Sequence, residues 1–102
     1  MHDEVTGKAF CSGKGAPDAV KSVSISDDEI VIDGWLNVDG LGKTEKKWSF
    51  GINENTQFGG VSGQGFKEYP KDEMIPHWEA HEFPTLVLEL ENGMAKRVYQ
   101  SS

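Results

Sequence analysis

The sequence predicts a mainly β protein, in which five or six antiparallel strands form a curled sheet or a small open barrel. Apolar and polar residues alternate between residues 20 and 53 and again between 85 and 100, which is typical of half-buried strands. Only residues 69–84 have a helical pattern, so we expect one short kinked helix at about 70–83, before a C-terminal β-hairpin. An α+β sheet with the helix lying across it is the alternative.

The chain of 102 residues is expected to form a single domain, because no second core fits into this length. Residues 1–19 are rich in Gly, Lys and Asp and show no periodicity apart from Ala9-Phe10-Cys11. We interpret them as a loose N-terminal arm. Residues 20–102 then make up one β-rich domain.

Three strands are predicted between residues 20 and 53. Val23 and Ile25 alternate with serines, and Asp27-Asp28 makes the first turn. The turn at 39–42 joins the second and third strands into a long hairpin with one buried and one solvated face. The expected buried residues are Ile30, Ile32, Leu36, Val38, Trp48, Phe50 and Ile52.

Residues 58–66 place four glycines between two phenylalanines. Glycines at this density weaken a strand, so a bulged strand or a mobile loop is predicted.

The last element is a hairpin around Asn92-Gly93, since Asn-Gly strongly favours a two-residue turn. A regular register pairs Glu89 with Lys96 and Leu88 with Arg97. It therefore predicts Arg97 on the face to be buried, where the guanidinium reaches the rim of the sheet or pairs with an acid or an anionic ligand.

Two prolines shape the predicted helix. Pro70 suits the first helical position, whereas Pro76 kinks the helix or divides it into two short pieces. Met74, Ile75 and Trp78 form an apolar stripe that is expected to cover part of the sheet.

Ten Lys and Arg against seventeen Asp and Glu give a net charge of −7. That field repels nucleic-acid phosphates and anionic membranes, so neither partner is expected. Cys11 is the only cysteine, and the N-terminal residues lack the apolar segment of a signal peptide. We therefore expect a cytoplasmic protein.

His77 and His81 have the i, i+4 spacing with which a helix presents two metal ligands. The other candidate ligands, His2 and Cys11, lie in the predicted arm, so we expect no metal and no cofactor. Cys11 has no histidine near it in sequence, which gives no support for a nucleophile.

Three functions remain open at this point. The favoured one is a non-catalytic binding module for a protein or a small molecule; an acidic inhibitor or immunity-type protein is the second, and a small enzyme around His77 and His81 the third. The candidate ligand-binding residues are Trp35, Trp78, Arg97, Tyr99, His77 and His81. Free strand edges also predict a homodimer.

Overall fold

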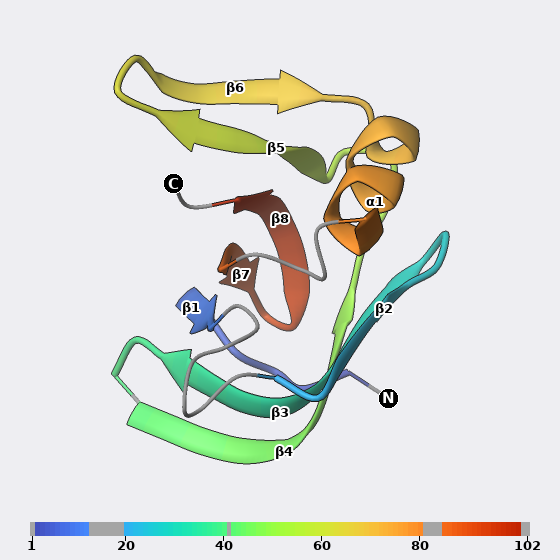
Figure 1. Cartoon of the computed structure of the whole chain (residues 1–102). Helices are drawn as coiled ribbons and strands as arrows, with labels where there is room; N and C mark the ends of the chain where they lie inside the picture. The colour runs from blue at the N-terminus through green and yellow to red at the C-terminus, as the bar shows by residue number, and fades with distance from the viewer. Residues whose placement is uncertain (1, 13–19, 41, 81–84, 101–102) are drawn as a thin grey trace.

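The computed structural model describes residues 2–12, 20–40, 42–80 and 85–100. These residues form one helix and eight strands (Figure 1). The strands are β1 (Gly7–Cys11), β2 (Ser22–Ile25), β3 (Glu29–Val38), β4 (Gly42–Gly51), β5 (Gln57–Ser62), β6 (Gly65–Tyr69), β7 (Leu86–Glu91) and β8 (Met94–Gln100), and the helix is α1 (Lys71–Ala80).

Five of the strands close into a barrel. β1 lies between β3 and β7, β7 pairs with β8, and β3 pairs with β4 along ten residues, all antiparallel. The ring closes where β4 meets β8 in parallel, at Gly51 and Met94. The prediction of a mainly β fold with one short helix is confirmed. The barrel, however, is closed rather than open, and it includes parallel contacts.

The remaining strands extend this ring. β2 pairs with the first half of β3, and β5 runs parallel to the end of β8 and antiparallel to β6. The ring order β1-β3-β4-β8-β7, with the helix before β7, is that of the OB-fold, a five-stranded Greek-key barrel. The β5–β6 hairpin is an insertion between β4 and α1, and it overhangs one end of the barrel (Figure 1).

The core fills the barrel and follows the predicted alternation. Ile30, Leu36 and Phe50 expose no surface, and each such side chain contributes about 1.5–3 kcal/mol through burial. The predicted buried residues of the long hairpin all belong to the core: Ile30, Ile32, Leu36, Val38, Trp48, Phe50 and Ile52.

The expectation of a loose N-terminal arm was wrong for the part that the structure describes. β1 is a barrel strand, in which Ala9 pairs with Val38 on one side and Leu88 on the other. Ala9 and Cys11 are buried in the core. Residues 13–19 lie outside the described residues.

The helix covers the barrel end beneath the hairpin, as its apolar stripe predicts. The Pro70 carbonyl accepts hydrogen bonds from the Glu73 and Met74 N–H groups, which opens the first turn. Met74 and Trp78 are buried, and the Trp78 ring packs 6.2 Å from that of Phe58. α1 runs through Pro76 as one helix rather than as two pieces. Of the predicted extent, residues 81–83 lie outside the described residues.

The C-terminal hairpin has the predicted turn but not the predicted register. Asn92 and Gly93 have φ angles of 50° and 84°, the left-handed conformation that a tight Asn-Gly turn requires. A β-bulge next to Glu89 then shifts the strands by one residue, so that Glu89 pairs with Arg97. The predicted Glu89–Lys96 and Leu88–Arg97 pairs do not form.

Candidate functional site

Of the described residues that are predicted to bind a ligand, the structure brings two together. Arg97 and Tyr99 lie next to each other on the outer face of β8, whereas Trp78 is fully buried in the core. Trp35 alternates with core residues of β3 and therefore faces outward, opposite Glu45. His77 lies on α1, and His81 is outside the described residues.

The bulge places Arg97 on the outside of the barrel, among four side chains that we call the Arg97 cluster: Gln57, Phe66, Glu89 and Tyr99. The Arg97 Nε–H donates to Gln57 Oε1 at 3.0 Å, and the guanidinium carbon lies 4.5 Å from the centre of the Phe66 ring. Glu89 Oε2 is 4.0 Å from an Arg97 terminal nitrogen. Arg97 therefore lies on the outer face of β8, and the predicted position on the buried face was wrong.

Tyr99 completes this cluster. Its ring meets Phe66 edge-on at 5.6 Å. Burial raises the pKa of Tyr99, and so does its hydrogen bond to Glu89 together with the negative charge of that carboxylate. Because the polar groups of the cluster largely satisfy one another, it holds the β5–β6 hairpin against the barrel rather than offering an open site.

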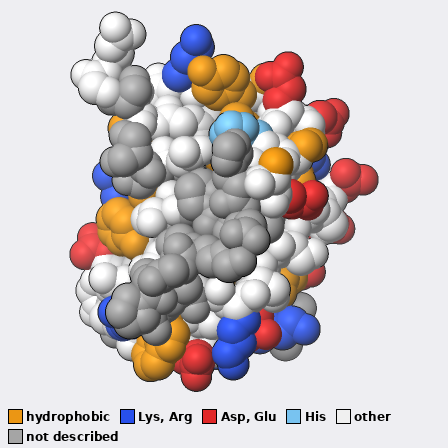
Figure 2. All heavy atoms as spheres, viewed as in Figure 1, with side chains coloured by type: hydrophobic (Ala, Val, Ile, Leu, Met, Phe, Trp, Pro, Cys, Tyr) orange, Lys and Arg blue, Asp and Glu red, His pale blue; other side chains and the backbone are white. Residues whose placement is uncertain are grey.

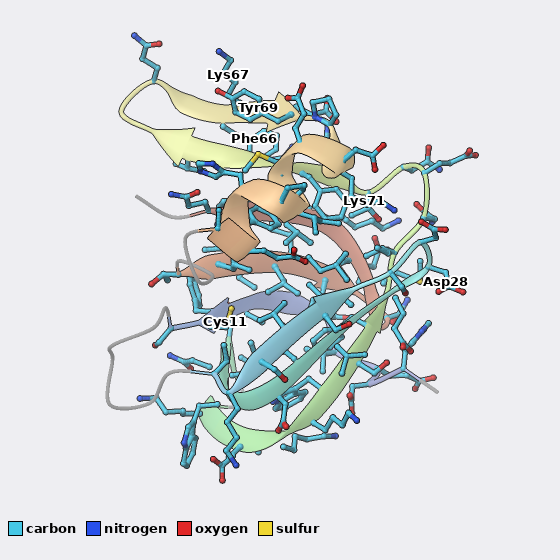
Figure 3. All side chains as sticks on the ribbon, turned by 45° about the vertical axis from the view of Figure 1, so that its right-hand side comes forward. Cys11, Asp28, Phe66, Lys67, Tyr69 and Lys71 are labelled. Carbon is cyan, nitrogen blue, oxygen red and sulfur yellow. The ribbon has the colours of Figure 1, made fainter. Side chains whose placement is uncertain are left out.

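A pocket of about 480 Å³ lies between the inner face of this hairpin and the helix. We call it the hairpin pocket. Figure 3 shows Phe66, Lys67 and Tyr69 along the hairpin strand beside the helix. The pocket is lined by Gly60, Val61, Lys67, Tyr69, Glu73, Met74, His77 and Gln100.

Strand and helix periodicity position these side chains. Lys67 and Tyr69 are two residues apart on β6 and so share its inner face, and the Lys67 ammonium lies 5.3 Å from the Tyr69 ring centre. Glu73 and His77 are four residues apart on α1 and share one side of the helix. The pocket therefore joins an aromatic wall to charged groups from two elements.

Gly60 makes room in the hairpin wall. It lies opposite Lys67, and a Cβ atom built there would meet no atom within 4 Å. The neighbouring Gly59 has a different role, because its Cβ would come within 2.0 Å of the Lys67 carbonyl oxygen. Gly59 thus permits the close pairing of β5 and β6, whereas the absence of a side chain at Gly60 leaves the pocket open.

A second hollow, of about 620 Å³, lies on the other side of Tyr69. Its lining residues include Asp27, Glu54 and Glu68, and Lys71, which also lines it, pairs with Asp27 at 3.5 Å. In the described part of the chain, no group of three or more His, Cys, Asp or Glu side chains is placed to hold a metal ion. We therefore take the hairpin pocket as the candidate site.

Cys11 is unsuited to nucleophilic chemistry. Its side chain is 1% exposed, and burial raises the pKa of the thiol to about 11, so the thiolate is scarce at neutral pH.

Charged side chains of both signs are mixed on the surface. Figure 2 shows acidic and basic groups interspersed around the face in view. On the outer face of β3 and β4, Asp33 pairs with Lys47 and Asn37 with Lys43 on either side of Trp35. A shared strand order does not identify a function.

No family model matches the sequence, and comparisons with curated proteins and with solved structures also give no match. Within the described residues, the structure contains no helix with the length and apolar character needed to cross a membrane.

Sequence reasoning found His77 in the pocket but missed most of its other residues. Lys67 and Tyr69 belong to β6, which begins inside the glycine-rich segment, and Gln100 is the last residue of β8. One signal was available: Lys67 and Tyr69 alternate with Phe66 and Glu68, which is the pattern of a strand.

Proposed function

We propose that the protein is a binding module for a small molecule that occupies the hairpin pocket. The observation that carries the proposal is the pairing of apolar walls, Tyr69 and Met74, with the ionisable groups of Lys67, Glu73 and His77 in a space of about 480 Å³. Sites for small molecules are typically concavities of about 300–1,000 Å³ with apolar walls and a few polar groups that fix orientation.

Two of the lining residues suit a ligand with an apolar body. Tyr69 is 36% exposed and has an aromatic ring, and Met74 adds an adaptable thioether. Among the described residues that line the pocket, none is a serine, threonine or cysteine that would serve as a nucleophile. These features favour binding over covalent catalysis, and we propose a non-catalytic role.

The test uses the fluorescent probe 8-anilinonaphthalene-1-sulfonate, whose flat rings and sulfonate match the walls and the Lys67 ammonium. Gly60→Leu places a side chain in the open space of the pocket without a steric clash at Cβ. Gly63→Leu is the matched control, since Gly63 is equally unobstructed and lies at the hairpin tip, outside the pocket lining. We expect one probe per chain, with affinity reduced about tenfold or more by Gly60→Leu and little changed by Gly63→Leu, because filling the site removes most of the contact area.

Two outcomes count against the proposal. One is the absence of saturable probe binding to the folded protein. The other is equal affinity of both leucine variants, which would place the probe elsewhere. A cooperative urea transition for each variant shows that the fold is intact, so that loss of binding reports on the pocket.

A further inference from the structure

Two residues of opposite charge line the hairpin pocket from different elements. Lys67 extends from the inner face of β6, and Glu73 projects from the first turn of α1. Both side chains are exposed. None of the ion pairs within 4.0 Å between described residues includes Lys67 or Glu73.

Both charges are held at the site by their elements. The Lys67 ammonium rests 5.3 Å from the centre of the Tyr69 ring, which keeps its stem along the pocket wall. Glu73 is anchored by its main chain, whose N–H donates to the Pro70 carbonyl at 3.0 Å in the first helical turn. The pocket therefore offers a cation on the hairpin and an anion on the helix, with an apolar wall at Tyr69.

We propose that the ligand of this pocket is a small zwitterion with an aromatic or apolar body. Its anionic group lies toward Lys67, its cationic group toward Glu73, and its body against Tyr69. A ligand with one charge leaves the opposite wall charge partly desolvated and unpaired, whereas a zwitterion offsets both. This inference rests on the proposed function, because it names the ligand class of the same pocket.

A short peptide with free termini provides a matched set of probes. We would titrate phenylalanyl-alanine, its N-acetyl derivative, its C-terminal amide and the doubly capped form into the protein, and follow the amide signals of β6 and α1 by NMR. The same titrations would be made with Lys67→Met and Glu73→Gln, which keep the size of each side chain and remove its charge.

We expect the amino group of the peptide to depend on Glu73 and its carboxylate to depend on Lys67. N-acetylation should weaken binding to the wild type about two- to fivefold and have little effect on Glu73→Gln, since partly exposed ion pairs are worth this much. Amidation should weaken binding to the wild type similarly and have little effect on Lys67→Met. Gly60→Leu should weaken binding of all four probes.

Three results would contradict the proposal of a zwitterionic ligand but would not contradict the proposed function. The first is equal affinity for the four peptides, which would indicate an uncharged ligand. The second is that N-acetylation still weakens binding to Glu73→Gln, or that amidation still weakens binding to Lys67→Met. The third is saturable fluorescence-probe binding that Gly60→Leu removes, with no binding of any peptide. Loss of all binding, the fluorescent probe included, would instead overturn the proposed function.

Discussion

Asp3 ties the N-terminal residues to the barrel. Its N–H donates to the Ser49 carbonyl at 2.7 Å, its carboxylate accepts the Ser49 N–H at 2.8 Å, and the same carboxylate pairs with Lys46. Burial alone raises the pKa of Asp3, but the hydrogen bonds from Lys46 and Ser49 and the nearby positive charge lower it further, so that it lies below the ordinary value of 3.8. The ionised carboxylate therefore stabilises the fold.

Asp3→Asn should lower the free energy of unfolding by about 0.5–1.5 kcal/mol at pH 6, because a charge-assisted hydrogen bond is replaced by a neutral one. A lowered folded-state pKa gives stability that is present above the unfolded pKa and is lost as pH falls through the folded one. The difference between wild type and variant should thus shrink below about pH 3.8. Urea unfolding at pH 6 and pH 3, followed by tryptophan fluorescence, measures it.

Asp39→Asn is the control for this experiment, since Asp39 is an exposed carboxylate at the turn after β3. It should change the stability little at either pH. If the wild type and Asp3→Asn differ in free energy of unfolding by as much at pH 3 as at pH 6, or by more, the ionised carboxylate is not the stabilising species.

At the scale of single residues, the sequence predicts which side chains are buried but not which residues of other elements lie beside them. The helical spacing of Met74 and Trp78 placed both correctly against the barrel, because amphipathic periodicity directly reports the buried side of a helix. Trp35 and Trp78 are both predicted to bind a ligand, yet Trp35 faces outward from β3 and Trp78 of α1 is buried in the core. Which strand lies over which residue depends on long-range pairing, which a single sequence does not encode locally.

At the scale of elements, the β5–β6 hairpin is attached to the barrel by parallel pairing with β8 and by the Arg97 cluster. Phe66→Ala removes the contacts with both Tyr99 and Arg97. An aromatic pair contributes about 0.5–1.5 kcal/mol and an exposed cation–π contact about 0.5–1 kcal/mol. We therefore expect Phe66→Ala to lower the free energy of unfolding by about 1–2 kcal/mol. Amide hydrogen exchange should accelerate in β5 and β6 before it does in β3 and β4.

Phe10→Ala is the matched control for the hairpin. Phe10 is 42% exposed on the outer face of β1, next to Val87, and its removal should leave exchange in β5 and β6 unchanged. If Phe66→Ala leaves the hairpin as protected as in the wild type, the parallel pairing with β8 alone holds this element.

The elements that the sequence missed share a physical cause. The bulge beside Glu89 leaves the apolar pattern of β7 intact and is absorbed by β8, so the regular register misplaced Arg97. β1 has only five residues, and those preceding Ala9 carry no apolar signal. The glycines of β5 left a bulged strand and a mobile loop equally open, although Gly59 permits the close approach of β6 in a regular pair. In each case tertiary packing overrides a weak local pattern.

At the scale of the whole molecule, barrel closure depends on contacts between distant segments. Gly51 meets Met94, and the Gly51 N–H donates to the Gly93 carbonyl at 2.8 Å. Sequence alternation sets which face of each strand is buried, but not which strands meet. It therefore predicted a curled sheet or an open barrel and left the ring undetermined.

The homodimer remains a prediction, and the structure suggests where it would form. β2 and β6 are the end strands of the described sheet. β6 carries Lys67 on its inner face, a charge that discourages pairing with another strand. β2 carries no charge between Ser22 and Ile25. The Ser26 N–H bonds to the Glu29 carbonyl, so by alternation the main-chain groups of Val23 and Ile25 point away from β3.

A two-fold axis at Ser24 would make this edge self-complementary. Val23 of each chain would lie opposite Ile25 of the other and exchange main-chain hydrogen bonds, and their side chains, already packed against the core, would extend it. Two copies of Ser24 would face each other at the centre. We therefore expect the wild type to sediment as a dimer at tens of micromolar in physiological salt, where the mutual repulsion of the acidic chains is screened beyond about 8 Å.

Ser24→Lys tests this arrangement, because it sets two like charges directly opposite each other, which is destabilising in a strand pair. The variant should sediment as a monomer, whereas Glu68→Lys on the other edge strand should leave the dimer intact. A wild type that is monomeric at tens of micromolar would contradict the dimer. Equal dissociation by both substitutions would contradict an interface confined to β2, and dissociation by Glu68→Lys alone would move the interface to β6.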